Sequence, residues 1–469
     1  MNKAAIKSFA VGARQELVRE IAGQVHKLGL DGMERLQETV EEMAYTWFIR
    51  LIALRYMEVN GILPGGLRLF AQKGENVRSA DLTARRLIHM CNRLSEGLPK
   101  LFPIINERTE ALFPTGVLSD GGLIDQMLGD IDEQDWMKSV EMLGWLHQYY
   151  HTEQKDKAFE ELLRENRKIS RERIAAATQL FTPDWIVRYL VENSLGRLWM
   201  DSASGGFQSS RWKYFAFTAC EQPVRALDQA AALDDLKQVK LIDPCMGSGH
   251  MLLYAFEMFL EWYGALGICP KEAAADILMY NLYGLDIDER AYRMSYLTLL
   301  MKAQQYDPDI LSKGIAPHVY TVADSRFMDE AFLDFVAGDD AECRVKLLLL
   351  RETFWEAREY GSLLKIPDLS IDRVRRRVQE IDQTFYDQVL DALMAEKVRE
   401  RLEPLLTLWD VLSDQYEVVV TNPPYMGKSH MDKKLRAYVS REYPLSNHDL
   451  FAVFIERCGE MLSQGGYQR

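Results

Sequence analysis

The sequence predicts an α/β fold, with a doubly wound parallel sheet preceded by an all-helical N-terminal domain. Up to about residue 175, apolar residues recur every three or four positions, which is typical of amphipathic helices. Beyond residue 178, short apolar runs alternate with helical patterns, and this alternation favours parallel strands joined by helical crossovers. The four predicted strands are "VKLIDP" (239–244), "LYGLDI" (282–287), "HVYTV" (318–322) and "YEVVVTN" (416–422).

These patterns divide the chain into a helical N-terminal domain, residues 1–175, and an α/β domain, residues 176–469. Within the second domain, residues 329–417 have a helical pattern and interrupt the strand alternation. They carry 12 Lys+Arg against 21 Asp+Glu, so we expect an acidic helical insertion that is unsuited to contact DNA. Its one basic cluster, "RVRRRV" (373–378), is expected to be a solvated helix face.

Composition excludes several classes of protein. A net charge of −14 over 469 residues is not that of a general nucleic-acid binder. The six cysteines are scattered without a C-x-x-C pair, which indicates a reduced, cytoplasmic protein without a zinc site. The apolar run "AYTWFIRLIALRYMEV" (44–59) contains Arg50 and Arg55, and it is too short and too charged to span a membrane.

The first predicted strand leads into a glycine-rich turn, "DPCMGSGHML", in which Gly247 and Gly249 flank Ser248. Glycines permit a tight turn and close approach of a ligand, and the N-terminus of the next helix offers free N–H groups to an anion. The Walker and G-x-G-x-x-G patterns are both missing. Asp243 would repel a pyrophosphate but suits an ammonium beside a carboxylate, as in the methionine end of S-adenosylmethionine. The alternative is a tight turn that binds nothing.

The next two predicted strands also end in acids. Asp286 lies where a carboxylate can accept from both hydroxyls of a ribose, and Ile287 could pack on an adenine face. Asp324 follows the third strand and could accept from the exocyclic amine of a cofactor's adenine. Solvated loop aspartates remain the alternative.

The fourth predicted strand ends in "TNPPY" (421–425). An exocyclic amine of a base is a poor nucleophile, because its lone pair is delocalised into the ring. The side-chain oxygen of Asn422 and the carbonyl of Pro423 could accept both of its N–H groups and localise that lone pair. Pro423 and Pro424 fix the backbone, and Tyr425 offers a flat face to a base turned out of its duplex. The alternative is a structural Pro-Pro turn closed by a packing tyrosine.

Together, "DPCMGSG" and "NPPY" resemble the amino-methyltransferases that methylate N6 of adenine in DNA. The segment "QLFTPDWIV" (179–187) is similar to the F-T-P segment that closes over the cofactor in this family. The resemblance implies a Rossmann-like methyltransferase sheet. It implies cofactor contacts for Phe181, Thr182, Pro183, Asp243, Gly247, Gly249, Asp286, Ile287 and Asp324, and catalytic roles for Asn422, Pro423, Pro424 and Tyr425.

The helical segments "SFAVGARQELVREI" and "AATQLFTPDWIVRYLVENSLGRLWM" resemble the methyltransferases of BREX phage-defence systems. That likeness implies a site-specific enzyme that uses S-adenosylmethionine and no metal. It implies double-stranded DNA and other defence proteins as partners. Ser325 stands where many of these enzymes have an aromatic residue after the third strand. Two other readings stay open: a protein glutamine methyltransferase, which also uses N-P-P-Y, and a non-catalytic scaffold of a defence complex.

The C-terminal residues predict an incomplete sheet. "QGG" (464–466) is expected to be a stop signal before a fifth strand that never comes, so the sheet would be truncated after its fourth strand with "EVVV" as an unpaired edge. The resemblance implies seven strands, with the rest of the sheet and target recognition on a downstream polypeptide. We expect the chain alone to bind S-adenosylmethionine weakly and not to methylate DNA. The segment "KSHMDKKLRAYVSR" (428–441) would be its only DNA-facing surface.

Overall fold

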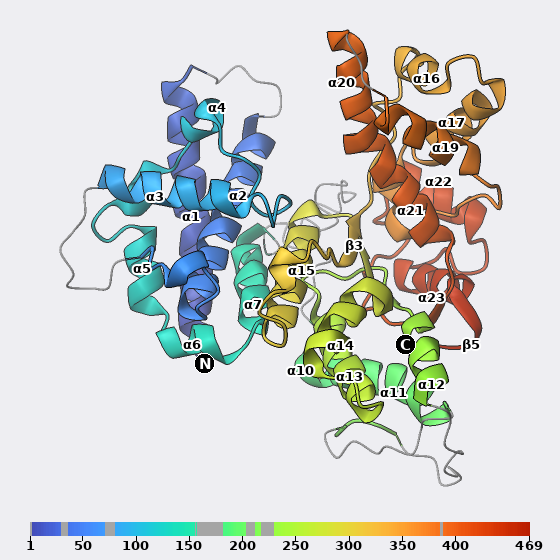
Figure 1. Cartoon of the computed structure of the whole chain (residues 1–469), viewed down its shortest axis with the longest axis horizontal. Helices are drawn as coiled ribbons and strands as arrows, with labels where there is room; N and C mark the ends of the chain where they lie inside the picture. The colour runs from blue at the N-terminus through green and yellow to red at the C-terminus, as the bar shows by residue number, and fades with distance from the viewer. Residues whose placement is uncertain are drawn as a thin grey trace.

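The computed structural model describes residues 2–29, 36–70, 80–154, 156, 182–202, 212–216, 229–384 and 388–469 (Figure 1). The helices before the sheet are α1 (Lys3–Lys27), α2 (Leu36–Val59), α3 (Ala80–Leu94), α4 (Glu107–Glu110), α5 (Leu123–Asp130), α6 (Glu133–Lys138), α7 (Glu141–Tyr150), α10 (Asp184–Glu192), α11 (Leu195–Asp201) and α12 (Gln229–Gln238). Those within and after it are α13 (His250–Ala265), α14 (Pro270–Asp276), α15 (Glu289–Gln304), α16 (Glu330–Ala337), α17 (Ala341–Thr353), α18 (Ala357–Tyr360), α19 (Asp372–Asp382), α20 (Val389–Lys397), α21 (Glu403–Ser413), α22 (Lys433–Glu442) and α23 (Leu450–Glu460).

Five parallel strands form one sheet in the order β3-β2-β1-β4-β5. They are β1 (Leu241–Asp243), β2 (Leu282–Asp286), β3 (His318–Thr321), β4 (Tyr416–Val419) and β5 (Leu462–Gln468). The first four lie within the predicted strand segments, and helices precede the sheet, so the predicted fold class is confirmed. The predicted boundary at residues 175 and 176 falls outside the described residues and stays a prediction.

Both faces of the sheet are covered, because side chains alternate between two hydrophobic cores along each strand. Leu241 and Val418 face a core that they share with α1, α2, α7, α13 and α15. Ile242 and Val419 face the other core, which α16, α17, α19, α21 and α23 complete. The first of these cores runs without interruption from α1 to the sheet, so the N-terminal helices and the α/β fold share apolar packing.

The N-terminal helices pack beside the sheet's own helices, and in Figure 1 α7 lies between α1 and α15. The predicted apolar run (44–59) forms most of α2. Both of its arginines have polar partners. Arg50 Nη2 donates to the carbonyl of Pro103 at 2.7 Å, and Arg55 pairs with Glu58 at 2.6 Å. Within the described ranges, no helix is both long and apolar enough to cross a membrane.

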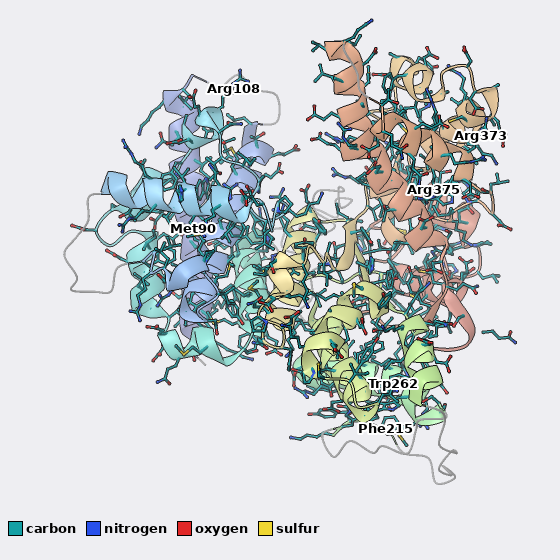
Figure 2. The ribbon with its side chains drawn as sticks, viewed as in Figure 1. Met90, Arg108, Phe215, Trp262, Arg373 and Arg375 are labelled. Atoms are coloured by element: carbon teal, nitrogen blue, oxygen red, sulfur yellow. The ribbon has the colours of Figure 1, made fainter. Side chains whose placement is uncertain are left out.

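The acidic insertion folds as helices α16 to α21, the orange group in the upper right of Figure 1. Figure 2 labels Arg373 and Arg375 on α19 within it. Arg373 pairs with Asp340, Arg375 with Asp410, and Arg377 with Glu380. Three arginines of the predicted solvated face are therefore neutralised by acids of the insertion itself.

The expectation that the sheet stops after its fourth strand is wrong. β5 pairs with β4, so Val418 and Val419 are flanked by strands on both sides. The two glycines lie inside β5 and do not precede it. While β4 advances from Tyr416 to Val418, β5 advances from Leu462 to Tyr467, and Gly465 has a φ of +83° in this bulge.

Gly466 has no room for a side chain, and this gives the first prediction. A Cβ built there would lie 2.7 Å from the carbonyl oxygen of Glu417 on β4. We expect Gly466→Ala to lower the free energy of unfolding by about 1–3 kcal/mol, the usual cost of overpacking. Thermal denaturation checks this, with Gly129→Ala as the matched control because an added Cβ there meets no atom within 4 Å. Equal melting temperatures for the two variants would show that β5 does not hold β4 closely.

Candidate active site

The predicted polar residues converge at one edge of the sheet. β1 lies between β2 and β4, and all three strands run in the same direction. Their carboxyl ends therefore bring the glycine turn, Asp286 and the segment after β4 together. This edge is also where open α/β sheets bind ligands.

Asp243 is the buried centre of this edge, with 2% of its surface exposed. Its Oδ1 accepts a hydrogen bond from Thr421 Oγ1 at 2.8 Å and another from the backbone N–H of Cys245 at 3.0 Å. Burial raises the pKa of the carboxyl to about 7, although these two hydrogen bonds lower it in part. The second oxygen, Oδ2, takes part in neither bond.

The glycine turn is tied to the tip of β2. Asp286 Oδ2 accepts from the backbone N–H of Gly247 at 2.9 Å, and its Oδ1 accepts from that of Asp288 at 2.8 Å. Burial raises the pKa of Asp286 to about 6. Gly247 and Gly249 have φ values of +53° and +81°, which only glycine adopts without strain. An added Cβ at Gly247 would meet no atom within 4 Å, so the space above the turn is open.

Helices α15 and α7 both pack against the glycine turn and the helix that follows it, and sequence reasoning missed both contacts. Ser295 Oγ of α15 donates to the carbonyl of Gly247 at 2.7 Å, and a Cβ at Gly249 would lie 3.0 Å from that same hydroxyl. On α7, a Cβ at Gly144 would lie 2.8 Å from the ring of His250. Gly144 therefore lets a helix of the N-terminal part pack directly against the start of α13. The sequence indicated this contact only through Gly144, a small residue within an apolar helix.

The acidic insertion also reaches this edge, which its composition did not indicate. Ser362 Oγ donates to the carbonyl of Pro244 at 2.7 Å. A Cβ at Gly361 would lie 2.8 Å from Ile287, so Ile287 packs against the insertion's backbone. Ile287 is partly buried and borders the apolar core on that face.

Asp324 lies further out, at the end of β3. Its Oδ1 accepts from the backbone N–H of Arg358 at 2.9 Å. The adjacent Ser325 is fully buried, and its hydroxyl donates to the carbonyl of Arg351 at 2.6 Å. Ser325 thus anchors the C-terminal end of α17.

The segment after β4 meets the F-T-P segment. Asn422 Nδ2 donates to Thr182 Oγ1 at 3.0 Å across 240 residues of sequence, and Asn422 Oδ1 accepts from Tyr425 OH at 3.3 Å. Pro183 caps α10, while Phe181 lies outside the described residues. Pro423 and Pro424 are partly buried, whereas the ring of Tyr425 is 57% exposed.

Two groups stand out among the predicted residues that the structure describes. Asp243, Gly247, Gly249 and Asp286 surround the open turn, and Asn422 and Tyr425 lie beside Thr182. The hydrogen bond from Thr421 to Asp243 connects the groups. Throughout the part of the chain that the structure describes, no group of His, Cys, Asp and Glu residues could hold a metal ion.

Comparison with known proteins shows what the chain is similar to. Residues 280–468 match the family model described as Eco57I restriction-modification methylase. This match spans β2 to β5, so that part of the Rossmann-like sheet is similar to restriction-modification methylases.

Over 97% of its length, the chain is 33% identical to the adenine-specific methyltransferase PglX of Lacticaseibacillus casei (strain Zhang). Over 91% of its length, it is 30% identical to the adenine-specific methyltransferase BrxX of Escherichia coli O9:H4 (strain HS). The chain spans 41% and 39% of the lengths of these two curated relatives. A solved structure of the Type IIL restriction-modification enzyme MmeI is similar with a TM-score of 0.39 and 13% identity, covering 98% of this chain and 49% of that one.

The bond between Thr421 and Asp243 gives the second prediction. The folded pKa of Asp243 lies near 7, above its ordinary value of 3.8, so the folded protein retains a proton between about pH 4 and 7 that the unfolded chain has lost. The contribution of Asp243 to the free energy of unfolding therefore falls as pH rises from about 4 to 7. Thr421→Val should cost about 1 kcal/mol at pH 5.5, where a neutral carboxyl loses one hydrogen bond, and about 1.5–3 kcal/mol at pH 8.5, where a carboxylate does.

Chemical denaturation at both pH values measures this difference. Thr321→Val is the matched control, because the buried hydroxyl of Thr321 has no hydrogen-bond partner in the described structure. An equal loss at both pH values would show that Thr421 does not stabilise the ionised form of Asp243.

Proposed function

We propose that this chain is the catalytic part of a site-specific DNA methyltransferase that transfers a methyl group from S-adenosylmethionine to N6 of adenine. It would serve in the cytoplasm as part of a BREX-type phage-defence and modification system. One observation carries the proposal: Asn422, at the head of the N-P-P-Y segment, is bonded to Thr182 of the F-T-P segment. This contact brings the proposed acceptor of the target amine to the proposed cofactor site.

The open turn fits S-adenosylmethionine. Oδ2 of Asp243 would take the ammonium of the methionine end, and the N-terminus of α13 would favour its carboxylate. Asp286 would accept from the ribose hydroxyls, with Ile287 against one face of the adenine and Asp324 toward its amine. Phe181, Thr182 and Pro183 would close over the methionine end.

When bound, S-adenosylmethionine supplies an electrophilic methyl group on a sulfonium. The chain's own residues would prepare the nucleophile. Asn422 Oδ1 and the carbonyl of Pro423 would accept the two N–H groups of the target amine, which localises its lone pair. The long 3.3 Å bond from Tyr425 OH to Asn422 would be exchanged for the amine, at small cost. Holding the amine in line with the methyl group would supply the rest of the rate acceleration. The proposed mechanism therefore uses no metal and no covalent enzyme intermediate.

Double-stranded DNA is the proposed substrate, with sequence recognition supplied from outside these 469 residues. The basic segment 428–441 is partly neutralised, because Lys434 pairs with Glu356 and Arg441 with Glu442. We therefore propose a further polypeptide that carries target recognition and docks on other defence proteins.

The third prediction tests the cofactor site. Asp286→Ala removes the proposed ribose acceptor and the acceptor of the Gly247 N–H, so the affinity for S-adenosylmethionine should fall tenfold or more, about 1.4 kcal/mol per decade. Isothermal calorimetry measures the affinity, and circular dichroism checks the fold. Asp309→Ala is the control. The Asp309 side chain is 64% exposed, and in the described structure its one ion pair is with Lys271. Unchanged affinity in a folded Asp286 variant would remove Asp286 from the site.

The fourth prediction tests the chemistry. Asn422→Ala should abolish methylation while leaving cofactor affinity within about twofold, because the amide is proposed to contact the target amine and not the cofactor. N6-methyladenine in host DNA is quantified by mass spectrometry, with the chain expressed beside the rest of its defence system. Asn106→Ala, at the exposed cap of α4, is the control. Wild-type modification levels in the Asn422 variant would exclude this mechanism, and methylated release-factor glutamine without N6-methyladenine would favour a protein substrate.

A further inference from the structure

A buried cluster of four polar rings lies where α2 and α7 meet the start of α15. Tyr45 on α2 is surrounded by three rings from the last turn of α7 and its C-cap, His147, Tyr150 and His151. All four side chains are buried, and none of them is among the predicted site residues. A polar group is costly to bury, so the hydrogen-bond partners of these rings indicate what the cluster does.

The hydroxyl of Tyr45 links α7 to the first turn of α15. It donates to the carbonyl of Arg290 at 3.1 Å, and its oxygen lies 2.8 Å from Nδ1 of His147. A hydroxyl has a single hydrogen, so the hydrogen between the other two atoms belongs to His147 Nδ1, which donates to Tyr45. Burial lowers the pKa of His147, so its ring is neutral and this tautomer is the one that fits. The Tyr45 hydroxyl is thus oriented by α7 toward the Arg290 carbonyl.

From Arg290, further hydrogen bonds reach both loops of the proposed cofactor site. The backbone N–H and Nε of Arg290 donate to Oδ1 of Asp288, at 2.9 Å and 3.1 Å. The backbone N–H of Asp288 donates to Oδ1 of Asp286 at 2.8 Å. Asp286 Oδ2 in turn accepts from the N–H of Gly247 at 2.9 Å. The path that begins at Tyr45 therefore ends at the tip of β2 and at the glycine turn.

We propose that Tyr45 is a positioning residue of the cofactor site and that it acts through Asp286. This inference rests on the proposed function, in which Asp286 accepts from the ribose hydroxyls. Hydrogen bonds weaken steeply when donor and acceptor are misaligned, so the orientation of that carboxylate sets the affinity. Tyr45 fixes the Arg290 carbonyl, and with it the first turn of α15 whose N-cap, Asp288, orients the Asp286 carboxylate.

A second contact of α7 supports this role. A Cβ added at Gly144 would lie 2.8 Å from the ring of His250 and 3.3 Å from Oγ of Ser248, within the glycine turn. Ser248 Oγ and His250 Nδ1 are themselves hydrogen-bonded at 2.9 Å. One helix of the N-terminal part therefore contacts the glycine turn directly and reaches the tip of β2 through Tyr45. The N-terminal helices form part of the scaffold of the cofactor site.

The test uses Tyr45→Phe, made in the full chain both alone and together with Asp286→Ala. Tyr263→Phe is the matched control, because Tyr263 is equally buried and its hydroxyl donates to Asn281 Oδ1 at 3.0 Å, just before the amino end of β2. Each change removes one buried hydroxyl and keeps the ring. His147→Leu is a second variant, because it removes the donor that orients the Tyr45 hydroxyl. Calorimetry measures the Kd for S-adenosylmethionine, and thermal denaturation measures stability.

We expect Tyr45→Phe to raise the Kd about fivefold and Tyr263→Phe to leave it within about twofold, although both lower the melting temperature. His147→Leu should raise the Kd in the same direction as Tyr45→Phe. In the Asp286→Ala background, Tyr45→Phe should have no further effect on the Kd, because the residue through which it acts is missing.

Two kinds of failure are distinguishable. A wild-type Kd in Tyr45→Phe, an equal rise in Tyr263→Phe, or additive effects of Tyr45→Phe and Asp286→Ala would overturn this inference alone. If Tyr45→Phe does not fold, His147→Leu decides by the same three comparisons. A wild-type chain with no affinity for S-adenosylmethionine would overturn the proposed cofactor and this inference together.

Discussion

The hydrogen bond from Thr421 to Asp243 is the contact on which the rest of the site depends. β1 turns into the glycine loop directly after Asp243, and β4 enters the Asn-Pro-Pro-Tyr segment directly after Thr421. Because the strands are parallel neighbours, a single bond of 2.8 Å fixes one loop against the other. Both groups are buried, and an unpaired partner there would cost more than the bond itself contributes, so the two loops are held in one arrangement.

The helical N-terminal part and the acidic insertion both make hydrogen bonds to loops at this edge of the sheet. Tyr45 of α2 bonds His147 of α7 and the carbonyl of Arg290, whose side chain pairs with Asp288 after β2. Burial lowers the pKa of His147 to about 4, so the ring stays neutral at physiological pH and acts as a fixed hydrogen-bonding group. The residues after β2 are therefore held by Tyr45, which lies 245 positions before Arg290 in the chain.

Sequence reasoning predicted the four apolar strands because buried parallel strands are continuous apolar runs. It also placed Asp243, Asp286 and Asn422 at one edge of the sheet, because the ends of parallel strands share an edge, while their roles in a site stay predictions. Sequence reasoning failed where backbone geometry determines whether a segment is a turn or a strand. Gly465 and Gly466 predict a turn by composition, but they form a bulge that lets β5 approach β4. Nor could composition show that the insertion would contact the site, because a hydroxyl donating to the carbonyl of Pro244 leaves no periodic pattern.

The electrostatics of the edge argue for a cationic ligand. Asp243 and Asp286 both carry pKa values raised by burial, and each further raises the pKa of its neighbours when ionised. Two buried acids at one edge raise their pKa values, and a positive charge placed beside them would stabilise their ionised forms. The N-terminus of α13 supplies only partial positive charge and favours an anion. A ligand that carries an ammonium, a carboxylate and a sulfonium in one molecule satisfies both requirements, whereas a nucleotide pyrophosphate would satisfy only the second.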